Sequence, residues 1–231
     1  MKTKPTSATP REPANQHRIR SEATRARILA AAYRQFVTNG LEGTRMEAIA
    51  SEAGVNKSLV YRHFGTRDGL YREVLRRAYE AIRQAEAELE LPDDPLQAID
   101  TLVSFTLHYY IENPDFIVLV GIENLNQGEH IRQIDHEGLL IPGLVERYDR
   151  VIRQGQARGL FRDRLNPVDL FSIATSLCWF TVATASTFGR TFDQDVFAPE
   201  NIRKREILIR ETVHRYLLRN PNHQAPTDGN K

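Results

Sequence analysis

Side chains that can hydrogen-bond to nucleic acid gather in one short segment, residues 56–67. The sequence there is NKSLVYRHFGTR, in which amide, hydroxyl, imidazole and guanidinium groups surround the apolar residues Leu59, Val60 and Phe64. Polar groups of these kinds bind phosphate oxygens and base edges. A helix fits the major groove of B-DNA and places its N-terminal residues nearest the bases. The composition is typical of a recognition helix.

Two helices and a tight turn would hold this segment in position. Thr44 and Glu47 match a capping box, in which a hydroxyl and a carboxylate each bind a free backbone N–H at a helix start. That helix would end at Gly54, because glycine supplies the positive φ that a tight turn requires. Asn56 can cap the next helix. We therefore expect a helix-turn-helix between Thr44 and Phe64.

The rest of the chain shows helical spacing of its apolar residues, and no stretch alternates as a strand does, so we predict an all-α fold. A first helix carries Ile28, Ala32 and Phe36 on one face and stops at Asn39-Gly40. Pro92 ends a long helix that follows the motif. The predicted helices outside the motif cover about 22–38, 67–89, 96–112, 115–127, 138–158, 168–188 and 200–219.

The charge of the chain is unevenly distributed. The 231 residues are 41% hydrophobic and 26% charged, with a net charge of +1. Residues 1–72 hold 13 basic and 6 acidic groups, a net charge of +7, whereas residues 73–231 hold 18 basic and 24 acidic groups, a net charge of −6. A polyanion such as DNA should therefore be drawn to the N-terminal third.

Nothing in the sequence indicates an enzyme. The motifs GxSxG, GxGxxG before a helix, HExxH and the P-loop are absent. The single cysteine, Cys178, fits a buried apolar position and a reducing cytoplasm. We expect no catalytic residue, cofactor or metal. The uncharged segment 170–189 contains seven Ser or Thr residues, which argues against a membrane span.

Residues 24–75, TRARILAAAYRQFVTNGLEGTRMEAIASEAGVNKSLVYRHFGTRDGLYREVL, resemble the TetR family of one-component repressors. The resemblance implies that Thr44 and Arg45 open the first motif helix near DNA. It also implies that Lys57, Tyr61, His63 and Arg67 contact phosphates.

From the residues alone, five side chains can reach base edges or phosphates: Arg45, Asn56, Ser58, Leu59 and Arg62. A partly buried packing role for Tyr61 and a solvated helix-end role for His63 remain open.

The expected domain order is a disordered basic tail (1–20), which has no apolar stretch, a three-helix DNA-binding domain (21–66), a helical effector-binding and dimerisation domain reached through the long helix (67–220), and a disordered tail (221–231). The resemblance implies that the last two helices form a four-helix interface in a homodimer. The residues offered for it are the apolar stripe and small residues Ile202, Ile209, Val213, Tyr216, Leu217, Ala174, Ala183 and Ala185. Packing within one monomer is the alternative.

Residues of the middle helices are candidates for an effector cavity. The candidates to line an apolar cavity are Phe105, His108, Tyr109, Phe116, Val120, Trp179 and Phe180. The polar candidates beside them are Glu123, Asn124 and Asn126. The segment around Glu123 and Trp179 is also similar to the pyrimidine-utilisation repressor branch. That similarity implies a planar effector, a nucleobase or an aromatic acid, stacked on Trp179 and bonded by Glu123 or Asn124. The alternatives are core packing, solvent exposure, and an architectural DNA-binding protein without a ligand.

Overall fold

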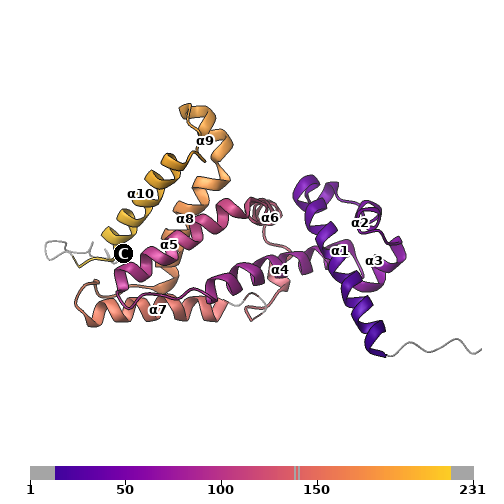
Figure 1. Cartoon of the computed structure of the whole chain (residues 1–231), viewed down its shortest axis with the longest axis horizontal. Helices are drawn as coiled ribbons and strands as arrows, with labels where there is room; N and C mark the ends of the chain where they lie inside the picture. The colour runs from indigo at the N-terminus through magenta and orange to yellow at the C-terminus, as the bar shows by residue number, and fades with distance from the viewer. Residues whose placement is uncertain (1–13, 138, 140, 220–231) are drawn as a thin grey trace, which may run out of the picture. The chain divides into compact units, whose positions relative to one another are not determined.

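The computed structural model describes residues 14–137, 139 and 141–219 (Figure 1). Its α-helices are α1 (Ala14–Gly43), α2 (Met46–Glu52), α3 (Lys57–Phe64), α4 (Arg67–Ala87), α5 (Pro95–Glu112), α6 (Pro114–Leu125), α7 (Ile141–Ala157), α8 (Pro167–Ala183), α9 (Ala185–Phe192) and α10 (Pro199–Leu217). A 3₁₀ turn covers Ile131–Gln133. Over these residues extended pairing is limited to one isolated bridge between Phe161 and Leu218. The predicted all-α fold is confirmed.

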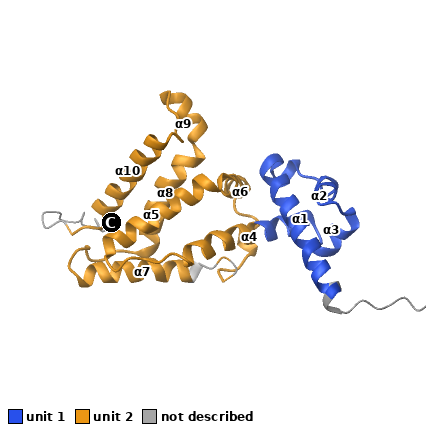
Figure 2. Cartoon of the chain, viewed as in Figure 1, with its two compact units in different colours: residues 1–74 blue, residues 75–231 orange. Residues whose placement is uncertain are grey.

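The chain forms two compact units, Met1–Val74 and Leu75–Lys231 (Figure 2). The division falls inside α4 rather than before Arg67, where the sequence placed it. The reason is that the first turns of α4 belong to the core of the first unit, since Leu70 and Tyr71 are fully buried. The Tyr71 ring packs edge-on against Phe36 at 5.0 Å.

In the first unit, α1 provides the face on which the motif packs. Ile28, Ala32 and Phe36 are fully buried, as their spacing by four predicted. The backbone leaves the helical conformation at Gly40 (φ 70°, ψ 176°), where the sequence predicted a stop. The helix begins earlier than expected, at Ala14, so residues 14–20 are helical rather than irregular. The remainder of the predicted tails, residues 1–13 and 221–231, lies outside the described residues.

In the second unit, α5 and α8 form the centre and contact each other along with α6, α7 and α10. Their buried faces include Leu102, Leu107 and Cys178. Burial raises the pKa of the Cys178 thiol to about 12, with Glu206 contributing, so this cysteine is a packing residue as the sequence predicted. The end of α10 is held by backbone bonds from Arg162 to Leu217 and from Arg219 to Leu160.

The helix predicted over 168–188 is broken into α8 and α9, which are bent by 70° at Thr184. The Thr184 hydroxyl donates to the Phe180 carbonyl at 2.6 Å, and Thr181 and Thr187 bond in the same way to carbonyls of the preceding turn. Such bonds compete with the helical ladder and bend helices. Along the described part of the chain no single helix is long and apolar enough to cross a membrane, and only this bent pair meets the length and composition together.

Candidate DNA interface and ligand cavities

The start of α2 differs from the predicted capping box. Arg45 occupies the N-cap position and its side chain makes no capping bond. The Thr44 side chain is only 2% exposed, and its hydroxyl donates to the carbonyls of Gln35 and Gly40 at 3.0 and 2.6 Å. The capping box is therefore wrong, because Thr44 ties α1 to the start of the motif. Its hydroxyl faces inward and is not at the surface expected to meet DNA.

The turn and the second motif helix match the sequence prediction. Gly54 adopts a positive φ of 64° directly after α2. The Asn56 side chain accepts the Leu59 N–H at 2.8 Å and caps α3. Gly65 (φ 72°) ends α3, and the Thr66 hydroxyl accepts the Gly69 N–H at 3.0 Å to start α4. Helix α3 is therefore a separate short element with a fixed beginning and end.

Most of the residues expected to contact DNA lie at the surface of the first unit. The exposed members are Arg45, Asn56, Lys57, Ser58, Tyr61 and Arg62, and the half-buried members are Leu59, His63 and Arg67. Val60 of α3 is fully buried and holds the helix on the unit. Tyr61 is 42% exposed, so its hydroxyl is open to solvent rather than packed in the core.

Two of these cations are paired with acidic residues, a pairing that the sequence did not predict. Lys57 bonds to Glu47, and this hydrogen bond lowers the pKa of Glu47 and raises the pKa of Lys57. The Lys57 ammonium also lies 5.5 Å from the centre of the Tyr61 ring. Arg67 bonds to Glu42 at 3.2 Å. All four side chains are at or near the surface, so a phosphate can replace either carboxylate.

His63 is held largely in its neutral form. Burial lowers the pKa of His63, and the positive charges of Arg62 and Arg25 lower it further. Arg25 is fixed in this position, because it pairs with Glu73 at 2.6 Å and lies over the Phe64 ring at 5.1 Å. The His63 imidazole is therefore harder to protonate than that of a free histidine.

In the second unit, the aromatic candidates for the effector site pack against one another. Phe116 is buried between the rings of Tyr79, Tyr109 and Tyr110, at 5.5, 6.2 and 6.0 Å. Tyr110 in turn meets Trp179 edge-on at 6.0 Å, and Phe105 lies 5.6 Å from Tyr109. Phe116 and Tyr110 are therefore core residues, which is one of the alternatives considered from the sequence. Phe105 and His108, in contrast, line a separate cavity of about 530 Å³ along α5.

The polar candidates have other partners. His108 faces Glu206 at 3.6 Å, and Asn124 is exposed and donates to the Val120 carbonyl at 2.9 Å. Glu123 is buried, and its Oε1 accepts the backbone N–H groups of His130 and Ile131, each at 2.8 Å. It thus organises the turn after α6. Neither Glu123 nor Asn124 lies free beside Trp179.

A cavity of about 650 Å³ lies between α4 and α7 and contains none of the predicted effector residues. It is lined by Arg83, Gln84, Glu86, Ala87, Glu137, Gly143, Leu144, Glu146, Arg147 and Arg150. Arg83 and Glu86 are buried and paired, and burial raises the pKa of Glu86 against the influence of Arg83. Among the residues that the structure describes, none is a hydrogen-bond partner for the buried Arg83 Nε. A ligand with an acceptor group could satisfy it.

The apolar stripe offered for dimerisation is mostly internal to the chain. Ile209, Val213 and Leu217 are buried within the second unit, as is Ala174. Arg162 covers the Tyr216 ring at 4.0 Å. For these four buried residues the prediction of a partner subunit is wrong, because α5 and α8 already cover this face of α10. Ala183 is exposed, and Ala185, Ile202 and Tyr216 are half-buried. The outward faces of the two helices instead carry Val168, Phe180, Ile207 and Leu208, which are exposed.

Two family models match the chain along these units. Residues 28–74 match bacterial regulatory proteins of the tetR family, and residues 95–213 match a tetracyclin repressor-like C-terminal domain. The chain belongs to the TetR family. Among the described residues, no group of three or more His, Cys, Asp or Glu side chains is placed to hold a metal ion.

Relatives within the TetR family are transcription regulators, not enzymes. The HTH-type transcriptional repressor NicS of Pseudomonas putida is 37% identical over 161 residues, which are 69% of this chain and 76% of NicS. The repressor SCO4008 of Streptomyces coelicolor is 29% identical over 164 residues, 70% of this chain and 79% of that protein. The solved TetR-family regulator HI0893 of Haemophilus influenzae shares the fold, with a TM-score of 0.61 at 19% identity over 87% of this chain and 99% of the other.

Proposed function

We propose that the chain is a repressor that binds a palindromic operator as a homodimer and leaves it when a small molecule binds. The observation that carries the proposal is the capped helix α3, whose exposed side chains are cationic or polar while Val60 anchors it to the unit. Arg45, Asn56, Ser58, Leu59 and Arg62 are assigned to base edges or phosphates. Lys57, Tyr61, His63 and Arg67 are assigned to phosphates.

Dimerisation is assigned to the outward faces of α8 and α10. Val168, Phe180 and Ile207 are each about half exposed, and together they leave apolar surface that a second copy can bury. A four-helix interface of this kind would set two α3 helices about 34 Å apart, one turn of DNA. Two half-sites then supply the affinity that one eight-residue helix lacks.

The effector is assigned to the cavity between α4 and α7. Its volume of about 650 Å³ suits a small organic molecule. Arg83 and Glu86 lie on α4, the helix that begins directly after the motif. A planar compound with a hydrogen-bond acceptor facing the Arg83 Nε would satisfy that buried group. A ligand that fits only one arrangement of α4 shifts the population toward that arrangement.

The proposal is tested by selecting genomic DNA fragments with the purified full chain and then footprinting them. We expect a short palindrome to be protected at moderate salt, with two protected half-sites per dimer. Even protection along the DNA would instead indicate an architectural protein. An Arg83→Gln variant should still protect the palindrome, because Arg83 lies outside the first unit. Compounds that release the wild type should not release this variant.

A further inference from the structure

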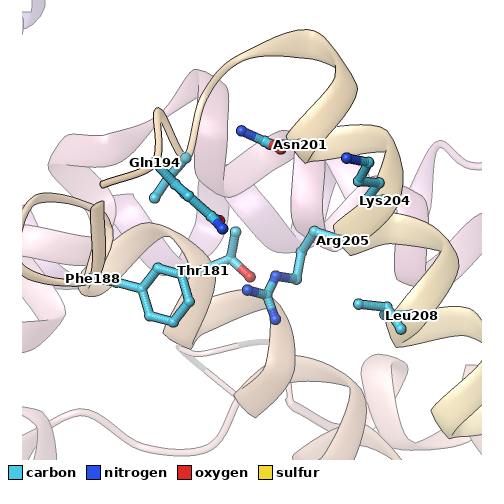
Figure 3. A pocket seen from close by; sticks show the side chains of 8 residues that line it. Thr181, Phe188, Gln194, Asn201, Lys204, Arg205 and Leu208 are labelled. Atoms are coloured by element: carbon cyan, nitrogen blue, oxygen red, sulfur yellow. The ribbon is translucent and has the colours of Figure 1, made fainter. Parts of the chain in front are cut away.

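Helix α9 and the segment 193–198 turn the chain back from α8 to α10 and enclose a small pocket (Figure 3). Its volume is about 180 Å³. It is lined by Thr181, Phe188, Gln194, Val196, Asn201, Lys204, Arg205 and Leu208. A cavity of about 150 Å³ can hold benzene, so this pocket has room for a compound with one ring.

The charge of the lining is entirely positive. It contains Lys204 and Arg205 and no acidic residue. No hydrogen bond or ion pair joins either cation to another residue in the described part of the chain, whereas Arg210, further along α10, pairs with Glu206. The Arg205 guanidinium lies 5.6 Å from the centre of the Phe188 ring. The Arg205 guanidinium therefore contacts an aromatic ring rather than a carboxylate.

The polar groups of the pocket add to this preference. Figure 3 shows the Gln194 side chain reaching into the pocket toward Arg205, so an amide faces the same space as the guanidinium. Asn201 is fixed at the rim, because its amide nitrogen donates to the Asp195 carbonyl at 2.7 Å. An anion held there would accept hydrogen bonds from the guanidinium and from the amide. Hydrogen bonds to an ionised group are stronger than those between neutral groups.

Backbone packing holds this arrangement in place. The Gln194 N–H donates to the Gly189 carbonyl at 2.9 Å. A Cβ at Gly189 would lie 2.7 Å from the Gln194 carbonyl oxygen, so only glycine allows the segment to approach α9 this closely. Asp193 adopts the left-handed conformation (φ 50°, ψ 50°) that reverses the chain. The position of Gln194 is thus set by the turn itself.

Three apolar side chains, Phe188, Val196 and Leu208, also line the pocket. The Phe188 ring is supported by Phe180 at 5.8 Å and Phe192 at 4.6 Å. An inorganic anion would gain nothing from these side chains, whereas the body of an organic acid would bury apolar surface against them. The lining therefore favours a molecule with one charged end and one apolar end.

We propose that this pocket binds a small organic monocarboxylate with a compact apolar body. Its carboxylate meets Arg205, Lys204 and the Gln194 amide, and its body lies on the Phe188 ring. Arginine is suited to this role because its planar fork matches a carboxylate. The site is separate from the effector cavity between α4 and α7 and shares no lining residue with it.

The test is titration calorimetry of the full chain with benzoate as the probe. We expect the wild type to bind one benzoate in this pocket per chain, and Arg205→Gln and Lys204→Gln each to weaken binding about tenfold or more. Arg203→Gln is the matched control, because Arg203 is exposed on the same helix and does not line the pocket. It should bind as the wild type does. Benzamide, which lacks the charge, should bind at least about tenfold more weakly than benzoate.

Three results would overturn the proposal. The first is no benzoate binding by the wild type, as expected if a second subunit fills the pocket. The second is equal weakening by Arg203→Gln and Arg205→Gln, which would mean attraction to general positive charge. The third is loss of the signal in Arg83→Gln, which would place benzoate in the other cavity. Inorganic phosphate should not displace benzoate at equal concentration, and displacement would also count against an organic acid site.

Discussion

The cations of the first unit and those of the small pocket between α8, α9 and α10 differ in the groups that face them. Lys57 and Arg67 are each bonded to a surface carboxylate, Glu47 and Glu42. Lys204 and Arg205 line a pocket that contains no acidic residue, and Arg205 lies beside the Phe188 ring. A cation with an exposed acidic partner can exchange that partner for a phosphate at little cost in desolvation. A cation in a pocket without an acidic partner can instead bind an anionic ligand that is small enough to enter the pocket.

The largest expected change in DNA affinity comes from removing Lys57 and Arg67, the two cations that are assigned to phosphates and paired with acidic residues. Lys57→Gln combined with Arg67→Gln should weaken binding to any DNA sequence by about 10- to 100-fold at moderate salt. The slope of log K against log salt should become shallower by about 1.8 units, because each phosphate contact contributes about 0.9. Fluorescence anisotropy with labelled operator DNA across a salt series measures both quantities.

The double variant Lys204→Gln and Arg205→Gln is the control, since it removes the same charge from the second unit. It should leave the salt slope unchanged. An equal loss in both double variants would show that overall charge governs binding and would end the distinction between the two sets of cations.

A smaller effect of opposite sign is expected when the acidic partners are neutralised. Glu47→Gln and Glu42→Gln should each strengthen binding to operator and to random DNA by about two- to fivefold, the effect of an exposed ion pair. The carboxylate no longer competes with phosphate for Lys57 or Arg67. The same anisotropy titrations measure the gain.

Glu52→Gln provides the matched control for this pair of variants. Glu52 bonds to Arg34 and Gln35, neither of which is assigned to DNA. Its neutralisation changes the net charge equally but should leave DNA affinity nearly unchanged. If Glu47→Gln instead weakened binding to the operator alone, Glu47 would be a base-reading residue rather than a competitor.

The features that sequence predicted well depend on neighbours along the chain. Gly54, Asn56 and Gly40 act within one turn of their own positions, so turn and capping chemistry is visible in the sequence. Thr44 was misassigned because the same local rules made it look like a helix cap. Its hydroxyl has a local use as a cap, but the fold of α1 offers the Gln35 and Gly40 carbonyls instead.

The second unit was less predictable because its site depends on packing between distant helices. Arg83 and Glu86 are an oppositely charged pair three residues apart, a pattern typical of a solvated helix face. Residues distant along the chain surround them: the Phe171 ring of α8 lies 5.5 Å from the Arg83 guanidinium, and residues of α7 line the same cavity. The break at Thr184 was likewise invisible, because the segment has helical spacing and the bend comes from hydroxyl bonds to carbonyls of the preceding turn.

The pH dependence of DNA binding tests His63, whose side chain is a cation only when it is protonated. The lowered pKa of His63 leaves the imidazole neutral near pH 7.5, and a phosphate favours the charged form. Binding is then linked to proton uptake, so affinity should rise about threefold as the pH falls from about 7.5 to 6. The His63→Gln variant should show a flat profile over this range, and a rise that persists in it would assign the proton to another group.

The smallest effect separates the two roles assigned to Asn56, the cap of α3 and a DNA contact. Asn56→Ala removes the acceptor for the Leu59 N–H and should lower the free energy of unfolding by about 1 kcal/mol. Asn166→Ala, at the cap of α8, should lower it similarly without changing DNA affinity. Asn56→Ser keeps a capping oxygen but lacks the amide. If DNA affinity returns with stability in Asn56→Ser, the residue acts by holding α3 in shape. If stability returns but DNA affinity does not, the Asn56 amide itself contacts DNA, and the DNA-binding surface extends to the N-cap of α3.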